Sequence, residues 1–412
     1  MRTVILIAFS FFTIPRANAQ QLQSYIQEAE LNSPQIQAFE SRYSIAKEKI
    51  NEANTVPNTE VSVGYFVSRP ETRTGAQRAK FSIQQMLPWF GSIKTRENYA
   101  SSLAEAEFIE ITIAKRKLAL SVSETYYLLY AIRAKQKVLD INIALLKTYE
   151  KMALTATKVG KASAVDVLKL QIRQNELLQQ KKVLLQKENG IQVAMNSLLN
   201  HEHADPVEVV TALEIPKEET IPDFETLSLN PELIKYDKLY NSVVEAEKLN
   251  QKEKAPNFGI GISYIPVEKR PAMDFSDNGK DIFMPMVSLS IPIFNNTYKS
   301  RTKQNELRQK KILSQKENRL NVLTSSFAKA ISQRNQARIK FDIQGKNLKQ
   351  ARNAKKILIN QYETNRIDFN DILDIQELQL KFEINQIEAV QEYYVQAALI
   401  NYLSLPAGQA GN

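Results

Sequence analysis

Two stretches of the chain alternate between apolar and polar residues in the way that β-strands do. The apolar residues of one face are Val61, Val63, Tyr65 and Val67 in the first stretch, and Phe258, Ile260, Ile262 and Tyr264 in the second. A partner segment with a less regular alternation follows each of them, over about 78–87 and 282–291. The pattern therefore predicts two β-hairpins, 59–87 and 257–292, each with one apolar face. The polar connections 69–77 and 267–281 are expected to be loops.

Long helical patterns follow both hairpins. From about Ser92 to Lys158, and from about Asn295 to Thr364, the chain has no proline and almost no glycine. A helix of ~65 residues is roughly 100 Å long. A returning helix is expected after each, with tips near 158–163 and 364–369. The returning helices carry apolar residues every seven positions, which predicts coiled-coil packing: Leu170, Leu177, Leu184, Ile191 and Leu198 in the first, and Leu373, Leu380, Ile387 and Tyr394 in the second.

The same order of elements occurs twice, with a period near 200 residues. Leu31-Asn32-Ser33-Pro34 and Leu229-Asn230-Pro231 each open a helix, and Pro57-Asn58 and Pro256-Asn257 each precede a strand. Proline can terminate a helix before a strand begins, because it lacks an N–H and disfavours the helical conformation at the preceding residue. We therefore expect a duplicated chain. Its segments are a first repeat over 20–200, a linker over 201–228, a second repeat over 229–404 and a disordered tail over 405–412.

The beginning of the chain has the layout of a secretory signal peptide. Arg2 precedes the apolar stretch Val4 to Ile14, and Ala17-Asn18-Ala19 is a small-x-small cleavage site. We expect residues 1–19 to be removed on export. The chain has no cysteine, which excludes disulfides, thiolate metal sites and lipid attachment through a cysteine. The net charge of +9 is spread along helical segments among many Glu and Gln, which favours solvated helix faces over a nucleic-acid site.

The predicted strands have the length of membrane-crossing strands, ~9–11 residues. Soluble hairpins packed on the helices are the alternative, but export, strand length and duplication together favour the membrane. In lipid only a closed barrel pairs every backbone group, and known barrels begin at ~8 strands. Four strands per copy cannot close, so two copies would supply eight strands and three would supply twelve. Only the wider barrel leaves an obvious lumen, and an oligomer is required in either case.

The sequence resembles the TolC family of outer-membrane efflux proteins over essentially the whole mature chain. The resemblance rests on the duplicated layout, the strand exit Gln85-Met86-Leu87-Pro88-Trp89-Phe90-Gly91, the Val159-Gly160 tip and Tyr362 with Asp371-Ile372-Leu373-Asp374. It implies a mixed, mainly α fold: a long coiled-coil α-helical barrel continuous with a 12-stranded transmembrane β-barrel shared by three chains. It also implies a homotrimer in the cell outer membrane that extends into the periplasm, with a periplasmic adaptor and an inner-membrane transporter as partners.

The candidate site residues lie at the two predicted tips. From the residues alone, Gly160 and Asn365 suit a helix C-cap, and Ser163 and Asp368 suit an N-cap. Asp166, Asp371 and Asp374 have two open interpretations: carboxylates that ring a cation-selective aperture, or carboxylates that complement helix dipoles. The resemblance implies that Tyr362 and Arg366 make contacts holding the aperture shut, and that the tips contact the adaptor. The tip residues are Val159, Gly160, Lys161, Ala162, Ser163, Asn365 and Ile367.

The expected function is passive exit of substrates from an inner-membrane pump, in a tripartite efflux or type I secretion system, without a cofactor. A soluble periplasmic coiled-coil scaffold without a pore is the first alternative. The second is a metal-handling protein, suggested by His201 and His203 beside Asp205. Pro206 and the acidic surroundings favour a solvated linker there. An enzyme is not expected, because the sequence has no nucleophile–base pair and no phosphate-binding loop.

Overall fold

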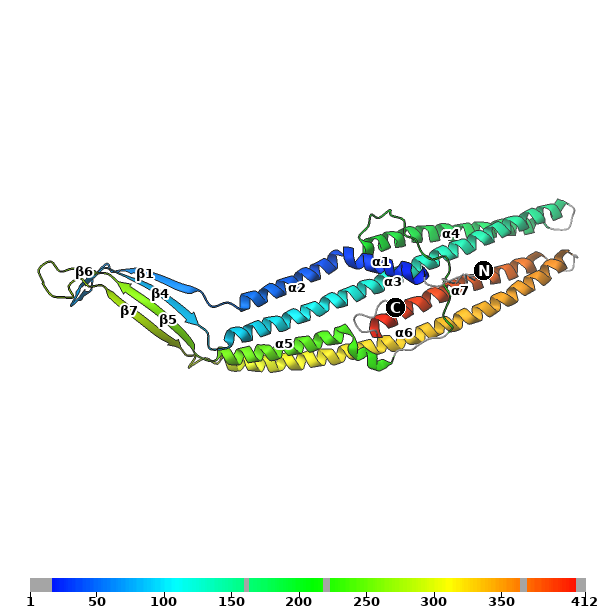
Figure 1. Ribbon diagram of the computed structural model, residues 1–412. Helices are drawn as coiled ribbons and strands as arrows, with labels where there is room; N and C mark the ends of the chain where they lie inside the picture. Colours follow the sequence, from blue (N-terminus) through cyan, green and yellow to red (C-terminus); the bar gives the residue numbers. More distant parts are fainter. Residues whose placement is uncertain (1–16, 159–162, 218–222, 364–368, 405–412) are drawn as a thin grey trace, which may run out of the picture. The chain divides into compact units, whose positions relative to one another are not determined.

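The computed structural model describes residues 17–158, 163–217, 223–363 and 369–404 (Figure 1). The expected signal peptide, apart from its last three residues, and the expected tail at 405–412 lie outside these ranges. The described chain is mainly helical, as predicted. Its helices are α1 (Ala17–Asn32), α2 (Pro34–Ala53), α3 (Ser92–Lys158), α4 (Ala164–Leu199), α5 (Pro231–Glu253), α6 (Thr297–Glu363) and α7 (Phe369–Ser404), with a 3₁₀ turn at Phe224–Leu229. No helix in this part of the chain is both long enough and apolar enough to cross a membrane.

The chain divides into two compact units, and each unit combines segments from both halves of the sequence. Unit 1 comprises the described parts of 1–38, 112–231 and 320–412, and unit 2 comprises 39–111 and 232–319. The helices α3 and α6 each contribute to both units. Unit 1 contains the two helical hairpins, α3 with α4 and α6 with α7, and unit 2 contains the strands (Figure 1).

Unit 2 has a four-stranded antiparallel sheet in the order β1-β4-β5-β7. The strands are β1 (Thr59–Tyr65), β4 (Ala79–Leu87), β5 (Asn257–Ile265) and β7 (Ile282–Ser290). The central pair, β4 with β5, joins the two hairpins, because Ile83 lies opposite Ile262 and Phe81 opposite Tyr264. The first and last strands of the order, β1 and β7, are the edges of the sheet.

The register puts apolar residues in line on one face of this sheet. One row across the four strands is Val63, Phe81, Tyr264 and Phe283, and the next is Val61, Ile83, Ile262 and Pro285. The opposite face has a row of three serines, Ser62, Ser82 and Ser263, followed by Met284, and the Ser82 and Ser263 hydroxyl oxygens are 2.8 Å apart. Val61, Val63 and Phe283 are each about two-thirds exposed, so nothing in the described chain covers the apolar face.

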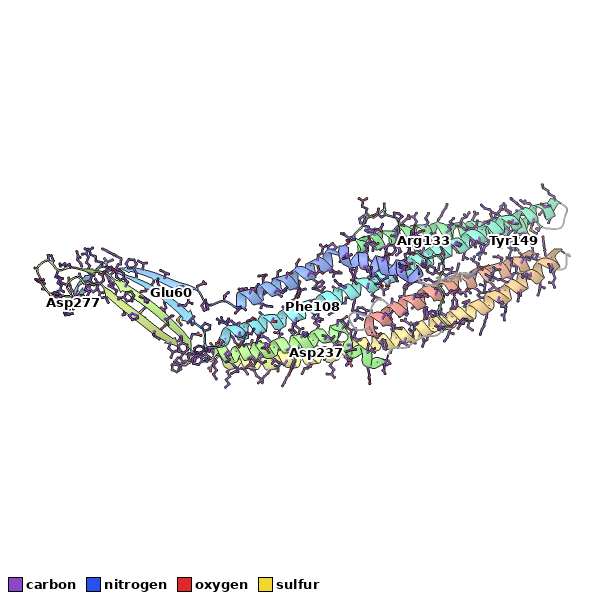
Figure 2. The ribbon with its side chains drawn as sticks, in the orientation of Figure 1. Glu60, Phe108, Arg133, Tyr149, Asp237 and Asp277 are labelled. Carbon is purple, nitrogen blue, oxygen red and sulfur yellow. The ribbon has the colours of Figure 1, made fainter. Side chains whose placement is uncertain are left out.

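The two connections expected to be loops contain short strands. A second, three-stranded sheet forms from β2 (Glu71–Thr72), β3 (Gly75–Gln77) and β6 (Val267–Glu268). Ion pairs join segment 69–77 to segment 267–281. They link Arg69 to Glu268 at 2.6 Å, Arg270 to Glu71 at 2.7 Å and Arg73 to Asp277 at 2.9 Å. Asp277 is marked in Figure 2. The alternation signal missed these strands because two or three residues are too few to show a period.

Short local signals switch the backbone between strand and helix. Pro88 follows the last residue of β4, and Gly91 has a φ of +80° directly before α3 begins. Glycine adopts that conformation without the steric cost that a Cβ brings. Before α6, the Asn295 side chain accepts a hydrogen bond from the Thr297 N–H at 2.9 Å, which satisfies a donor that the helix leaves free. At the end of α4, Asn200 takes the left-handed conformation with a φ of 58°.

The helical hairpins of unit 1 pack around a buried cluster. Leu170 and Leu177 of α4 are almost fully buried in it, together with Leu139 of α3 and Ile372 of α7. The heptad pattern identified the first two correctly. Leu178 and Leu185 of the same helix are 38% and 48% exposed in the single chain, so they face away from this cluster.

Candidate functional site

The candidate site is the end of unit 1 where each helical hairpin turns. The first turn lies between Lys158 of α3 and Ala164 of α4, and the second lies between Glu363 of α6 and Phe369 of α7. Residues 159–162 and 364–368 are outside the described ranges. The tip residues Val159, Gly160, Lys161, Ala162, Asn365 and Ile367, the gate residue Arg366 and the expected cap Asp368 therefore have no structural description. Ser163, Asp166, Tyr362, Asp371 and Asp374 do.

Ser163 and Asp166 form a reciprocal cap at the start of α4. The Ser163 Oγ accepts a hydrogen bond from the Val165 N–H at 3.2 Å, and the Asp166 carboxylate accepts one from the Ser163 N–H at 3.1 Å. Such a capping box satisfies backbone donors that a helix N-terminus otherwise leaves free. Asp166 is half-buried in this arrangement. Its carboxylate therefore has a local structural task, which favours the helix-end interpretation for this residue.

Replacing Ser163 by alanine is expected to loosen the start of α4. The loss of an N-cap hydroxyl costs about 1 kcal/mol of helix stability. Hydrogen exchange at residues 164–168 should accelerate about fivefold, because the opening free energy falls by that amount. Ser163→Asp keeps a capping acceptor and is the matched control. Equal exchange in Ser163→Ala and in the unaltered chain would show that the cap does not hold this turn.

Asp371 and Asp374 are both exposed on α7. Asp371 lies in the first turn of the helix. Asp374 lines a cavity of about 280 Å³ between α3, α4 and α7, together with Lys169 and Arg173. The two aspartates thus lie three residues apart near the N-terminus of one helix, and their carboxylates are open to solvent within a single copy.

The wall around Asp374 contains contacts that join the two hairpins of unit 1. The Lys169 ammonium donates to the Asn370 Oδ1 at 2.9 Å, and Arg173 pairs with Glu377 at 2.7 Å. These contacts link residues about 200 positions apart, and no local pattern could have paired them.

Tyr362 packs inside its own chain. Its ring lies 5.3 Å from the Phe369 ring, and Phe369 is also in edge contact with Tyr149 at 5.7 Å. Phe369 is only 3% exposed. The cluster joins α3, α6 and α7, and Figure 2 marks Tyr149 near the end of α3. One of the two predicted gate residues is therefore anchored to an aromatic core, whereas its expected partner Arg366 is outside the described residues.

A polar chain crosses the same three helices. The Gln376 amide donates to the Asn142 side-chain oxygen and accepts from the Lys355 ammonium at 2.6 Å. Burial lowers the pKa of Lys355 from its ordinary value, and its ammonium lies 5.9 Å from the centre of the Tyr149 ring. Burial likewise raises the pKa of the Tyr149 hydroxyl. Buried polar groups with partners of this kind specify one relative position of the helices.

The histidine pair is arranged differently from a metal site. His201 Nε2 lies 2.8 Å from the Glu28 carboxylate, and the His203 backbone oxygen accepts from the Asn196 amide at 3.1 Å. Within the described ranges, no group of three His, Cys, Asp or Glu side chains is placed to hold a metal ion. The segment after α4 is attached instead by Asn196, whose amide also donates to the Asp205 backbone oxygen at 2.9 Å.

Comparison with known proteins identifies the fold. No protein-family model and no curated protein sequence matches this chain. Several solved structures match it closely in fold. A membrane protein from Pseudomonas aeruginosa aligns with a TM-score of 0.78 at 14% identity, over 100% of this chain and 97% of that one. The outer-membrane channel OprN aligns with a TM-score of 0.77 at 16% identity, over 94% and 90%.

A third match is the open state of the MtrE outer membrane channel of Neisseria gonorrhoeae, with a TM-score of 0.72 at 16% identity over 93% of this chain and 88% of that one. At such identities the agreement concerns the fold. The chain has the fold of TolC-family outer-membrane channels, as the sequence resemblance indicated.

Proposed function

We propose that this chain is the outer-membrane exit duct of a tripartite efflux or type I secretion system. Three copies would close a 12-stranded barrel from their four-stranded sheets and continue it as a barrel of helices in the periplasm. Substrates would pass through it passively after an inner-membrane transporter delivers them. The shared fold with outer-membrane channels supports this proposal.

One observation carries the proposal: a sheet with an uncovered apolar face and two free edges. Large exposed apolar patches mark an interaction surface, and unpaired strand edges are unstable both in water and in lipid. Closing β1 of one copy on β7 of the next removes the edges, and lipid covers the apolar face. The small and polar opposite face suits a water-filled lumen.

The duct needs no catalytic residue, and its proposed mechanism is a change in the width of its periplasmic end. The tips around 159–163 and 364–368 would contact the periplasmic adaptor. If the adaptor binds the open arrangement better than the closed one, it shifts the population toward open without any chemical step. The contacts of Tyr362, Lys169 and Arg173 described above are the ones such a movement would disturb.

Purified full-length protein tests the proposal in two measurements. We expect an oligomer that resists heat in detergent, and stepwise ion conductance when it is added to a planar lipid bilayer. A monodisperse monomer without conductance would instead identify a soluble coiled-coil scaffold. An oligomer that forms but conducts no ions would support assembly of the helices and contradict the proposed pore.

Replacing Asp371 and Asp374 together by alanine is expected to lower cation selectivity. In a trimer these residues supply six carboxylates, and a ring of acidic side chains favours cations in a narrow pore. The reversal potential under a salt gradient measures the change. Lys381→Ala, which alters charge at an exposed position of the same helix, is the control. Unchanged selectivity in the double variant would leave the two aspartates as helix-end residues only.

A further inference from the structure

The excess of basic over acidic residues in this chain lies in one helix. Helix α6 contains 17 Lys and Arg residues and 4 Asp and Glu residues, whereas the whole chain has 54 and 45. The remainder of the chain is therefore net acidic. The basic residues are spread along helical segments, as expected, but the net positive charge falls on α6, and that charge needs negative partners.

Part of α6 has such partners and part does not. Within unit 2, Arg301 pairs with Glu253 at 2.9 Å, and Lys316 pairs with Asp237 at 2.6 Å. Figure 2 marks Asp237 on α5. Further along, in unit 1, the exposed ammonium groups of Lys349 and Lys356 have no carboxylate within 4 Å in the described parts of the chain.

These unpartnered lysines line a groove between α6 and α7. The groove has a volume of about 690 Å³ and lies entirely within unit 1. Its charged lining residues are Lys349, Arg352, Lys355 and Lys356, and no carboxylate lines it. Volumes of ~300–1,000 Å³ are typical of small-ligand sites.

The spacing of the cations puts them on one face. Residues three and four apart are neighbours on a helix, so Lys349, Arg352 and Lys356 form a row along α6. Like charges at this spacing repel one another and destabilise the helix. One carboxylate, that of Glu383 of α7, is 3.2 Å from Arg352 and also favours the charged form of Lys355, so it leaves Lys349 and Lys356 uncompensated. A multivalent anion in the groove would reverse this repulsion.

The rest of the lining supplies neutral hydrogen-bonding groups and space. Gln379 and Gln386 of α7 lie across the groove from the cations, and the Gln379 Oε1 is buried without a hydrogen-bond partner in the described chain. Gly345 opens one end of the groove, since a Cβ there would come within 3.3 Å of the Gln386 amide nitrogen. Gly345 is the only glycine of α6, and elsewhere on that helix a side chain would occupy the corresponding space.

We propose that this α6–α7 groove is a binding site for a soluble multivalent oxyanion of the size of a di- or triphosphate. Arginine presents a planar fork that matches phosphate oxygens, and lysine adds point charges around it. The groove belongs to unit 1, whereas the apolar sheet that would meet lipid belongs to unit 2, so the ligand is a dissolved anion and not a lipid headgroup. The site is complete within one copy and does not depend on the formation of a duct.

Isothermal titration calorimetry with sodium triphosphate tests the site on the full-length protein in detergent. We expect saturable binding of one triphosphate per chain that weakens as sodium chloride rises, because salt screens charge attraction. The double variant Lys349→Gln/Lys356→Gln should bind at least about tenfold more weakly, since each lost charge-assisted contact is worth roughly that factor. Lys310→Gln/Lys311→Gln removes the same charge from exposed positions of α6 outside the groove, and should change affinity less than about twofold.

A charge-neutral variant locates the ligand. Gly345→Leu leaves every cation in place but fills the Gln386 end of the groove, and should also weaken binding. Equal losses in the two lysine pairs would show attraction to net charge alone and overturn the proposal. So would full affinity in Gly345→Leu, or the absence of saturable binding. None of these outcomes depends on ion conductance, so the anion site and the proposed duct are tested independently.

Discussion

If the chain forms the proposed duct, lysine in place of Ile83 is expected to prevent its insertion into the outer membrane. Ile83 lies at the centre of the apolar face, between Val61 and Ile262. A lysine facing lipid near the middle of a barrel costs about 2–4 kcal/mol. The proposed trimer would carry that cost three times, so the assembled barrel would lose its stability relative to the unassembled chain. Fractionation of cells and heat-resistant oligomers on gels measure the loss.

The neighbouring residue provides the matched control for this prediction. Gln84 faces the other side of the same strand, opposite Gly261, where the chain already has Lys80 two pairs further along. Gln84→Lys should therefore assemble normally and change only the conductance. Failure of both variants would indicate that the strand tolerates no charge on either side, as in a soluble sheet packed on both faces. Normal assembly of the Ile83→Lys variant would show that this face of the sheet does not contact lipid.

Alanine in place of Phe369 is expected to release the start of α7. Phe369 is buried against Tyr149 and Tyr362, so its removal leaves a cavity at the junction of three helices. Deleting a buried phenyl ring costs about 3–5 kcal/mol. Hydrogen exchange over residues 370–380 should accelerate at least about a hundredfold, because opening of that segment becomes easier by this amount.

The same measurement on a surface variant isolates the cause. Lys381→Ala changes an exposed residue of α7 and should leave exchange in the segment nearly unchanged. If Phe369→Ala exchanged no faster than Lys381→Ala, the aromatic cluster would not be what holds the two hairpins together. In the proposed duct, a released α7 would also raise the time that channels spend open, and bilayer recordings on the same variant provide that second readout.

The elements of this chain could be predicted because their signals are local. Alternation identified β1, β4, β5 and β7, and the absence of proline marked α3 and α6 to within a few residues of their ends. The Ser163 cap was predicted from its position before a helix. By contrast, β2, β3 and β6 were missed, since strands of two or three residues have no period and depend on ion pairs between distant connections.

The candidate site likewise has features that local sequence signals predict and features that depend on contacts between distant segments. The sequence placed Asp166, Asp371 and Asp374 near helix starts, but only the structure distinguished the first, which caps its helix, from the other two, which remain open to solvent. Likewise, the sequence contains the basic residues of α6 but does not show which of its lysines find carboxylates. That depends on which helices lie beside α6 at each level, since partners come from α5 in unit 2 and from α7 in unit 1.

The sequence by itself determined that this chain alternates hairpins with very long helices, twice, and that four strands cannot close a barrel alone. Those conclusions follow from periodicity and from the need to pair backbone groups, which are properties of short segments. Only the tertiary structure decided that β4 pairs with β5, that Lys169 and Arg173 reach α7, and that a cationic groove opens along α6. These contacts join residues far apart in the chain, and packing of the whole unit selects them.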